Sequence, residues 1–130
     1  MRLAFALAAL VVASPAGAAA PQVISTDPGK DVRLGVFAVV HKDCSTGAAP
    51  EIRIARPPSH GVMLLQSVTL STKHVDNCPV VTAPARQITY RPAAGFIGQD
   101  NVAFDVVDPV TKQADLHPVM IAVQTMQLKP

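Results

Sequence analysis

The chain has 130 residues, a length that suits a single domain, and a formal net charge of +2 at pH 7. Its basic and acidic residues are interspersed along the sequence. They form neither the basic stripe that a phosphate backbone requires nor the polybasic tract that anionic lipid attracts. We therefore expect no nucleic acid and no membrane surface among its partners.

The first 18 residues are typical of a secretory signal peptide. Arg2 supplies a positive charge, residues 3–13 form an apolar run, and Ala16-Gly17-Ala18 fits the small-residue cleavage pattern. We predict cleavage after Ala18 rather than Ala20, because the second choice would leave Pro21 as the first residue. An uncleaved anchor is the alternative, but the apolar run is short for a membrane span. Residues 19–130 are therefore predicted to be one exported domain, periplasmic or secreted, without membrane insertion.

Several short alternating segments predict strands in the first half of that domain. Val23 and Ile24 suggest a short edge strand. Residues 32–40 follow, with Val32, Leu34, Val36, Ala38 and Val40 on one face and a second face that is partly apolar through Phe37 and Val39. Ile52 and Ile54 open the next strand, and a turn at residues 57–61 leads into an apolar run at 62–65. Within that run, either Val62 and Leu64 or Met63 and Leu65 face inward.

Residues 66–85 are the least regular part of the chain. The segments 68–70 and 80–82 suggest a short extra hairpin within an inserted loop. Cys44 and Cys78 are the only two cysteines, and an even number in an exported protein favours a disulfide over a thiol or metal pair. We expect this bridge to tie the insertion to the loop around Cys44 and to place any binding specificity there.

The most informative stretch is residues 88–108, ITYRPAAGFIGQDNVAFDVVD, which predicts a strand, a turn and a second strand. Ile88 and Tyr90 share one face, and Val102, Phe104 and Val106 alternate in the second strand. A last strand around residues 119–123 is expected to pair with the strand that holds Phe104. The six or seven short strands with turn residues between them predict an all-β sandwich.

The same stretch resembles the end of bacterial immunoglobulin-like and cadherin-like repeats, which show a tyrosine, a proline, a Gly-Phe-x-Gly-x-Asp turn and an aromatic strand. The segment IRIARPPSHG, residues 52–61, is similar to the strand and Pro-x-His-Gly turn of those repeats. The resemblance covers roughly residues 32–123 and implies an antiparallel immunoglobulin-like sandwich of about seven strands. It implies no activity, because such a fold hosts many functions. The residues that carry its turns and core are His60, Gly61, Tyr90, Pro92, Gly95, Phe96, Gly98, Asp100 and Phe104.

Metal and cofactor sites are not indicated by residue spacing. His41, His60, His74 and His117 are not spaced from one another as metal ligands usually are. Asp100, Asp105 and Asp108 suggest calcium, since cadherin-like repeats can bind it between domains, but the Asp-rich linker is missing. We interpret Asp100 as a turn residue that accepts backbone N–H bonds, and we expect no metal and no cofactor.

Catalytic motifs are equally sparse. No Gly-x-Ser-x-Gly elbow is present, both cysteines are expected to be oxidised, and Ser59 and His60 are sequence neighbours rather than a nucleophile and base. The leading hypothesis is a small exported non-enzymatic module that binds protein or glycan or serves as an envelope component. One alternative is a copper- or zinc-handling protein using His41, His117 and Met63 or Met120. Another is an inhibitor or accessory subunit of an exported enzyme.

Overall fold

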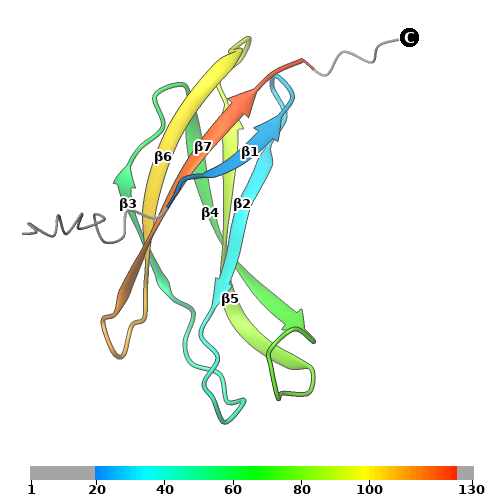
Figure 1. Cartoon of the computed structure of the whole chain (residues 1–130), viewed down its shortest axis with the longest axis vertical. Helices are drawn as coiled ribbons and strands as arrows, with labels where there is room; N and C mark the ends of the chain where they lie inside the picture. Colours follow the sequence, from blue (N-terminus) through cyan, green and yellow to red (C-terminus); the bar gives the residue numbers. More distant parts are fainter. Residues whose placement is uncertain (1–19, 126–130) are drawn as a thin grey trace, which may run out of the picture.

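The structure is a computed structural model that describes residues 20–125 (Figure 1). The described residues form seven strands: β1 (Gln22–Thr26), β2 (Val32–Ala38), β3 (Glu51–Arg56), β4 (Gly61–Thr72), β5 (Val81–Pro92), β6 (Gly98–Val107) and β7 (Ala114–Val123). The predicted signal peptide, residues 1–18, lies outside the described residues. Residues 20–125 include no helix that is long and apolar enough to cross a membrane.

The strands form two sheets that pack against each other. One sheet has the order β1-β7-β6-β3 and the other the order β2-β5-β4. All pairs are antiparallel except β1 with β7, which is parallel. The predicted all-β sandwich of about seven strands is confirmed, and its strand order is compatible with an immunoglobulin-like fold. The parallel β1–β7 pair is the one exception, within residues 20–125, to the antiparallel arrangement that the resemblance implies.

The core lies between the sheets and is built from the alternating residues of β5, β6 and β7. Ile88 and Tyr90 enter it from one sheet, and Val102, Phe104 and Ile121 enter it from the other. Each of these side chains is at most 2% exposed. Phe104 lies opposite His117 in the pairing of β6 with β7, as predicted for the last strand. Burying each large apolar side chain stabilises the fold by roughly 1.5–3 kcal/mol.

β2 contains a bulge that the sequence pattern does not reveal. Its pairing with β5 shifts register between Arg33 and Gly35, so Leu34 is an additional residue on the inward face. Phe37 rather than Val36 then faces the core, and its ring centroid lies 5.7 Å from that of Phe104. The prediction that Val36 and Ala38 continue the inward face is wrong, because an extra residue reverses the alternation that follows it.

The hairpin predicted within residues 66–85 is present, but it is not separate from the flanking strands. These residues extend β4 and β5 into one continuous hairpin, whose pairing runs without a register shift from Gly61 opposite Pro92 to Thr72 opposite Val81. Within the apolar run, Met63 lies opposite Tyr90 and packs against the core, whereas Leu65, opposite Ile88, is 47% exposed at the edge of the sheet. The segment is hard to read because its buried residues near the tip are small, mainly alanines on β5.

The sandwich has two ends with different chemistry (Figure 1). The turns at residues 27–31, 57–60 and 93–97 lie at the upper end in that view, which we call the Asp100 end. The loop at residues 39–50, the hairpin tip at 73–80 and the turn at 108–113 lie at the lower end, which we call the disulfide end. The residues singled out in the sequence divide between these two ends.

Candidate functional site

Asp100 is the centre of a buried polar cluster at the Asp100 end. Its side chain is 2% exposed, and Asp100 is the one charged residue that is buried among residues 20–125. Its carboxylate accepts backbone N–H bonds from Ser59 at 2.9 Å, from His60 at 2.9 Å and from Asn101 at 3.0 Å. A buried carboxylate is costly unless it is hydrogen-bonded, and these three donors offset that cost.

Tyr90 supplies the fourth donor to the same carboxylate. Its hydroxyl donates to Asp100 at 2.8 Å and lies 3.3 Å from the carbonyl oxygen of His60. Burial raises the pKa of Asp100, but the hydrogen bonds to its charged form outweigh that effect, so its pKa is lowered overall. Burial, the bond to Asp100 and the charge of that carboxylate all raise the pKa of the Tyr90 phenol.

The turn at residues 57–60 is held against the next turn by backbone contacts. The N–H of Ala93 donates to the carbonyl of His60 at 2.8 Å, and the His60 ring stacks on Phe96 with centroids 4.3 Å apart. A Cβ atom at Gly61 would lie 2.4 Å from the carbonyl oxygen of Arg91 and 2.7 Å from the Tyr90 ring. Only glycine therefore fits where β4 leaves this turn.

The second turn, at residues 93–97, completes the cluster. Pro92 is buried opposite Gly61, and the N–H of Phe96 donates to the carbonyl of Ala93 at 3.1 Å. Gly95 and Gly98 have φ angles of +75° and +143°. Both angles belong to a region that residues with a Cβ rarely adopt.

Eight of the nine residues that carry the resemblance therefore meet at one end of the sandwich: His60, Gly61, Tyr90, Pro92, Gly95, Phe96, Gly98 and Asp100. Phe104 lies apart from them in an aromatic cluster. Its ring stacks with that of His117 at 5.4 Å, and Phe37 contacts both rings. His117 is half-buried against these two phenylalanines.

Ser59, His60 and Asp100 are the residue types of a hydrolase triad, but they are not arranged as one. Asp100 accepts hydrogen bonds from the backbone of the other two residues, and the ring of His60 is stacked on Phe96. A triad requires the carboxylate to orient an imidazole N–H and the imidazole to reach the hydroxyl. The cluster instead connects two turns, and among the described residues no buried side-chain nitrogen or oxygen lacks a hydrogen-bond partner.

The residues considered for metal binding are distributed over both ends. Asp108 accepts backbone bonds from Val110 at 2.8 Å and Thr111 at 3.2 Å, and these bonds lower its pKa. Asp105 lies within β6, away from the carboxylate of Asp100 in the buried cluster. Within residues 20–125, no group of three or more His, Cys, Asp or Glu side chains is placed to hold a metal ion.

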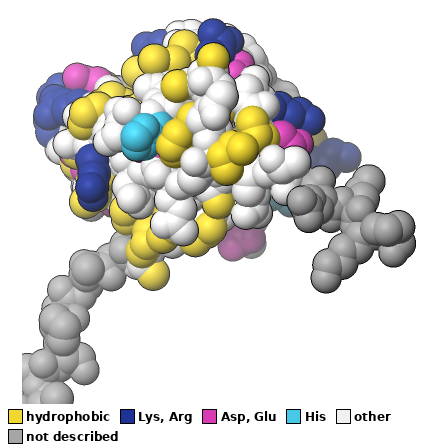
Figure 2. Space-filling model, turned by 90° about the horizontal axis from the view of Figure 1, so that it is seen from above, with side chains coloured by type: hydrophobic (Ala, Val, Ile, Leu, Met, Phe, Trp, Pro, Cys, Tyr) yellow, Lys and Arg dark blue, Asp and Glu magenta, His cyan; other side chains and the backbone are white. Residues whose placement is uncertain are grey.

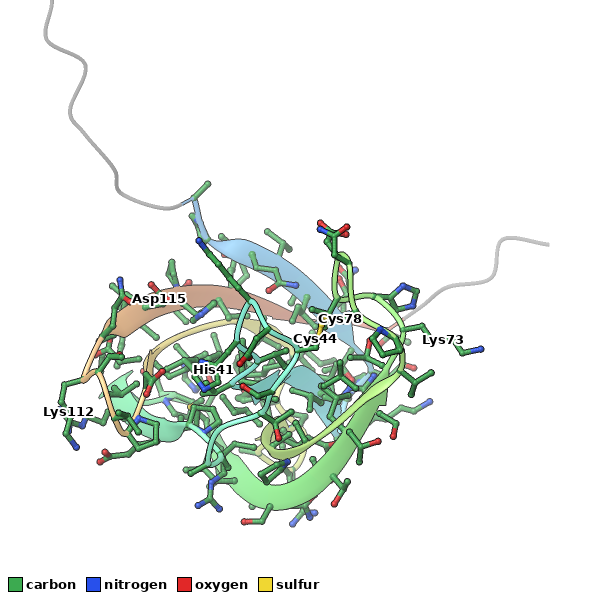
Figure 3. All side chains as sticks on the ribbon, turned by 90° about the horizontal axis from the view of Figure 1, so that it is seen from below. His41, Cys44, Lys73, Cys78, Lys112 and Asp115 are labelled. Atoms are coloured by element: carbon green, nitrogen blue, oxygen red, sulfur yellow. A yellow bond between two sulfur atoms is a disulfide. The ribbon has the colours of Figure 1, made fainter. Side chains whose placement is uncertain are left out.

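The disulfide end carries the predicted bridge between Cys44 and Cys78 (Figure 3). The two Cα atoms are 5.6 Å apart, and the cysteines are 34 positions apart in the sequence. Asp43 orders the loop at residues 39–50, since its carboxylate accepts a hydrogen bond from the backbone of Ser45 at 3.0 Å and one from its hydroxyl. The bridge fastens this loop to the hairpin tip, so two exposed loops form one surface.

Shallow hollows lie at both ends. One of about 430 Å³ lies at the Asp100 end beside His60, Arg91 and Ala94, and Figure 2 shows this end with a histidine among hydrophobic side chains. Another, of about 220 Å³, lies at the disulfide end between Val40, Pro50 and Asp115. Both are open surface features rather than the enclosed clefts in which small ligands are usually held.

Comparison with known proteins adds no family or function to this geometry. No protein-family model, no curated protein and no solved structure matches the chain.

Proposed function

We propose that this protein is an exported, non-catalytic module of the immunoglobulin-like, cadherin-like type that binds another protein through the loops of its disulfide end. The observation that carries the proposal is the Cys44–Cys78 bridge, which holds two exposed loops from different parts of the chain as one surface. Loops fixed on a rigid sandwich are a common location for recognition, because ordering them costs little further entropy on binding.

The type of module is supported by strand order and by motif. The parallel β1–β7 pair and the separate β2-β5-β4 sheet are compatible with an immunoglobulin-like arrangement. The residues of the Gly-Phe-x-Gly-x-Asp segment gather around Asp100, where they connect turns. Export is supported by the signal-like residues 1–18 and by the disulfide, which is consistent with an oxidising compartment.

The composition of the disulfide end favours a protein partner. Its exposed side chains carry both signs of charge, including Lys42, Asp43, Lys73 and Asp76, and Val80 is 55% exposed at the base of the tip. Charged and apolar groups mixed over an open surface resemble the rim and core of a protein interface. A polyanion would require a single sign of charge instead.

A site-specific photo-crosslinking experiment tests this proposal. A photoreactive side chain replaces His74 in the hairpin tip, and the matched control carries it at Ala94, which is exposed at the opposite end. We expect a discrete protein adduct in extract of the exported fraction from position 74 alone, and its loss when the disulfide is reduced. Equal adducts from both positions, or no adduct from position 74, would contradict the proposed surface.

A further inference from the structure

The two sheets have four edge strands, and three of them are protected against pairing with another chain. β1 is five residues long and lies against β2. β2 carries Arg33 and the bulge at Leu34. β3 is six residues long, carries Glu51, Arg53 and Arg56, and has a register shift between Ile54 and Arg56. Short length, charged side chains and bulges are the features by which natural sheets prevent edge pairing.

β4 has none of these features. It is twelve residues long, GVMLLQSVTLST, without a charged residue or a proline, and its pairing with β5 has no register shift. Its other edge faces no strand among residues 20–125, so a row of backbone N–H and C=O groups remains open there. At about 3.3 Å per residue, this edge is roughly 40 Å long.

Apolar side chains accompany the open edge. Val62 is 51% exposed and Leu65 is 47% exposed on β4, and a hollow of about 230 Å³ separates Leu65 from Ile52 and Glu51 on β3. Pairing of the edge would therefore bury both backbone groups and apolar surface. A band roughly 15 Å wide along a 40 Å edge buries about 600 Å² per copy, which is the lower end for a specific interface.

We propose that β4 pairs antiparallel with β4 of a second copy, so that two three-stranded sheets become one sheet of six strands with the order β2-β5-β4-β4-β5-β2. The uncharged sequence favours this occupant. In a register centred on Gln66, Leu64 lies opposite Val68 of the second copy and Val62 lies opposite Leu70. In a register centred on Ser67, Leu65 lies opposite Thr69, so no like charges meet on the new strand pair in either case.

Self-pairing of β3, an edge strand of the four-stranded sheet, would be opposed by charge. An antiparallel pair centred on Arg53 places this arginine opposite its own copy, and like charges directly opposite each other are destabilising. Arg86, the charged neighbour nearest to the centre of β4, lies one strand away on β5 and is bonded to the Ser67 hydroxyl. In the register centred on Gln66, Ser67 lies opposite Leu65 of the second copy, so the two Arg86–Ser67 pairs are diagonal neighbours rather than directly opposed, and this register is favoured over the one centred on Ser67. This inference does not depend on the proposed function of the disulfide end.

Sedimentation velocity of the purified protein over a concentration series tests the self-pairing. We expect a reversible monomer–dimer equilibrium with a dissociation constant in the micromolar range. Gln66→Lys places two lysines together near the centre of the interface and should weaken the dimer at least tenfold. Gln66 is exposed, so the variant should retain the fold. Ser25→Lys makes the same kind of change at an exposed position on β1 and is the matched control.

A mixture of two variants with opposite charges at residue 66 distinguishes strand pairing from a general loss of association. Gln66→Glu alone should also be monomeric, but an equimolar mixture of Gln66→Glu and Gln66→Lys should form heterodimers at least as tightly as the wild type. Wild-type protein that remains monomeric at several hundred micromolar would overturn the proposal, whether or not a strand of another protein binds this edge. A dimer that Gln66→Lys leaves intact, or that Ser25→Lys also disrupts, would overturn it as well.

Discussion

Tyr90 and Asp100 join the two sheets of the sandwich through a 2.8 Å hydrogen bond from the phenol to a carboxylate oxygen. Tyr90 belongs to β5 in the three-stranded sheet, and Asp100 belongs to β6 in the four-stranded sheet. The bond is assisted by charge and is buried, so water does not compete for either group. It also brings the turn at residues 57–60 onto the same carboxylate, which makes this pair the structural centre of the Asp100 end.

Replacement of Asp100 by asparagine should lower the free energy of unfolding by about 2–3 kcal/mol. The variant loses the charged acceptor and directs an NH₂ group toward backbone donors that then remain buried without a partner. Tyr90→Phe should cost roughly 1.5–3 kcal/mol by removing one bond to a charged group. Urea denaturation of both single variants and the double variant measures their coupling. We expect the double variant to lose less than the sum of the two, and Asp105→Asn to serve as a near-neutral control.

The lowered pKa of Asp100 predicts how stability depends on pH. The ionised carboxylate is favoured in the folded state, so its contribution is complete above the unfolded value near pH 4 and is lost as pH falls through the folded pKa. Wild-type stability should therefore decrease steeply below about pH 4. The slope should be smaller in Asp100→Asn, because this variant lacks the Asp100 carboxylate. The lowered pKa values of Asp31, Asp43 and Asp108 contribute equally to the pH dependence of both proteins. Parallel pH profiles for the two proteins would contradict this account.

Gly61→Ala should destabilise the fold by about 1–3 kcal/mol, although the change adds only one methyl group. The added Cβ would overlap a carbonyl oxygen of the paired strand and the ring of Tyr90, neither of which is free to move. Gly47→Ala is the matched control, because its nearest neighbour is a Val39 methyl at 3.2 Å in a surface loop. Equal melting temperatures for the two variants would show that the turn before β4 relaxes more easily than its contacts indicate.

Phe104→Ala should be one of the most destabilising single changes, at roughly 3–5 kcal/mol. The side chain is 1% exposed, and its removal leaves a cavity between Phe37 and His117. Ala103→Ser, one residue earlier and on the opposite face of β6, should change stability by less than about 0.5 kcal/mol. Urea melts that reversed this order would contradict the register of β6.

The sequence predicts the strands whose alternation is regular and whose side chains are large. Tyr90, Phe104 and Ile121 all occupy the inward positions that period-two spacing indicates. The β2 face after Leu34 is not predictable in this way, because one bulged residue reverses the pattern and leaves no signature in a strand that is apolar on both sides. The continuous β4–β5 hairpin is obscured for a different reason, since alanines rather than large residues are buried near its tip.

The Asp100 end shows a similar division between what the residues reveal and what they do not. A turn aspartate that accepts backbone N–H bonds is predictable from its neighbours, because Gly-x-Asp turns commonly satisfy it locally. The donors from Ser59 and His60, however, come from residues 41 and 40 positions away, and only the packing of the two sheets brings them together. The contacts of Phe37 with Phe104 and His117 depend on the bulge in β2, which turns Phe37 toward the core.

Reduction of the Cys44–Cys78 disulfide should loosen the disulfide end before it unfolds the sandwich. The bridge closes a loop of 34 residues, and its loss should lower the free energy of unfolding by roughly 3–4 kcal/mol through the entropy of the unfolded chain. The loop at residues 39–50 and the tip at 73–80 contain few buried apolar side chains, so they should open first. Hydrogen exchange measured with and without reductant should show faster exchange in these two segments, while amides around Tyr90 and Phe104 stay protected. The double variant Cys44→Ala/Cys78→Ala without reductant is the control and should give the same pattern. Uniform acceleration across all strands would contradict the prediction, because it would mean that the bridge stabilises the sandwich only as a whole.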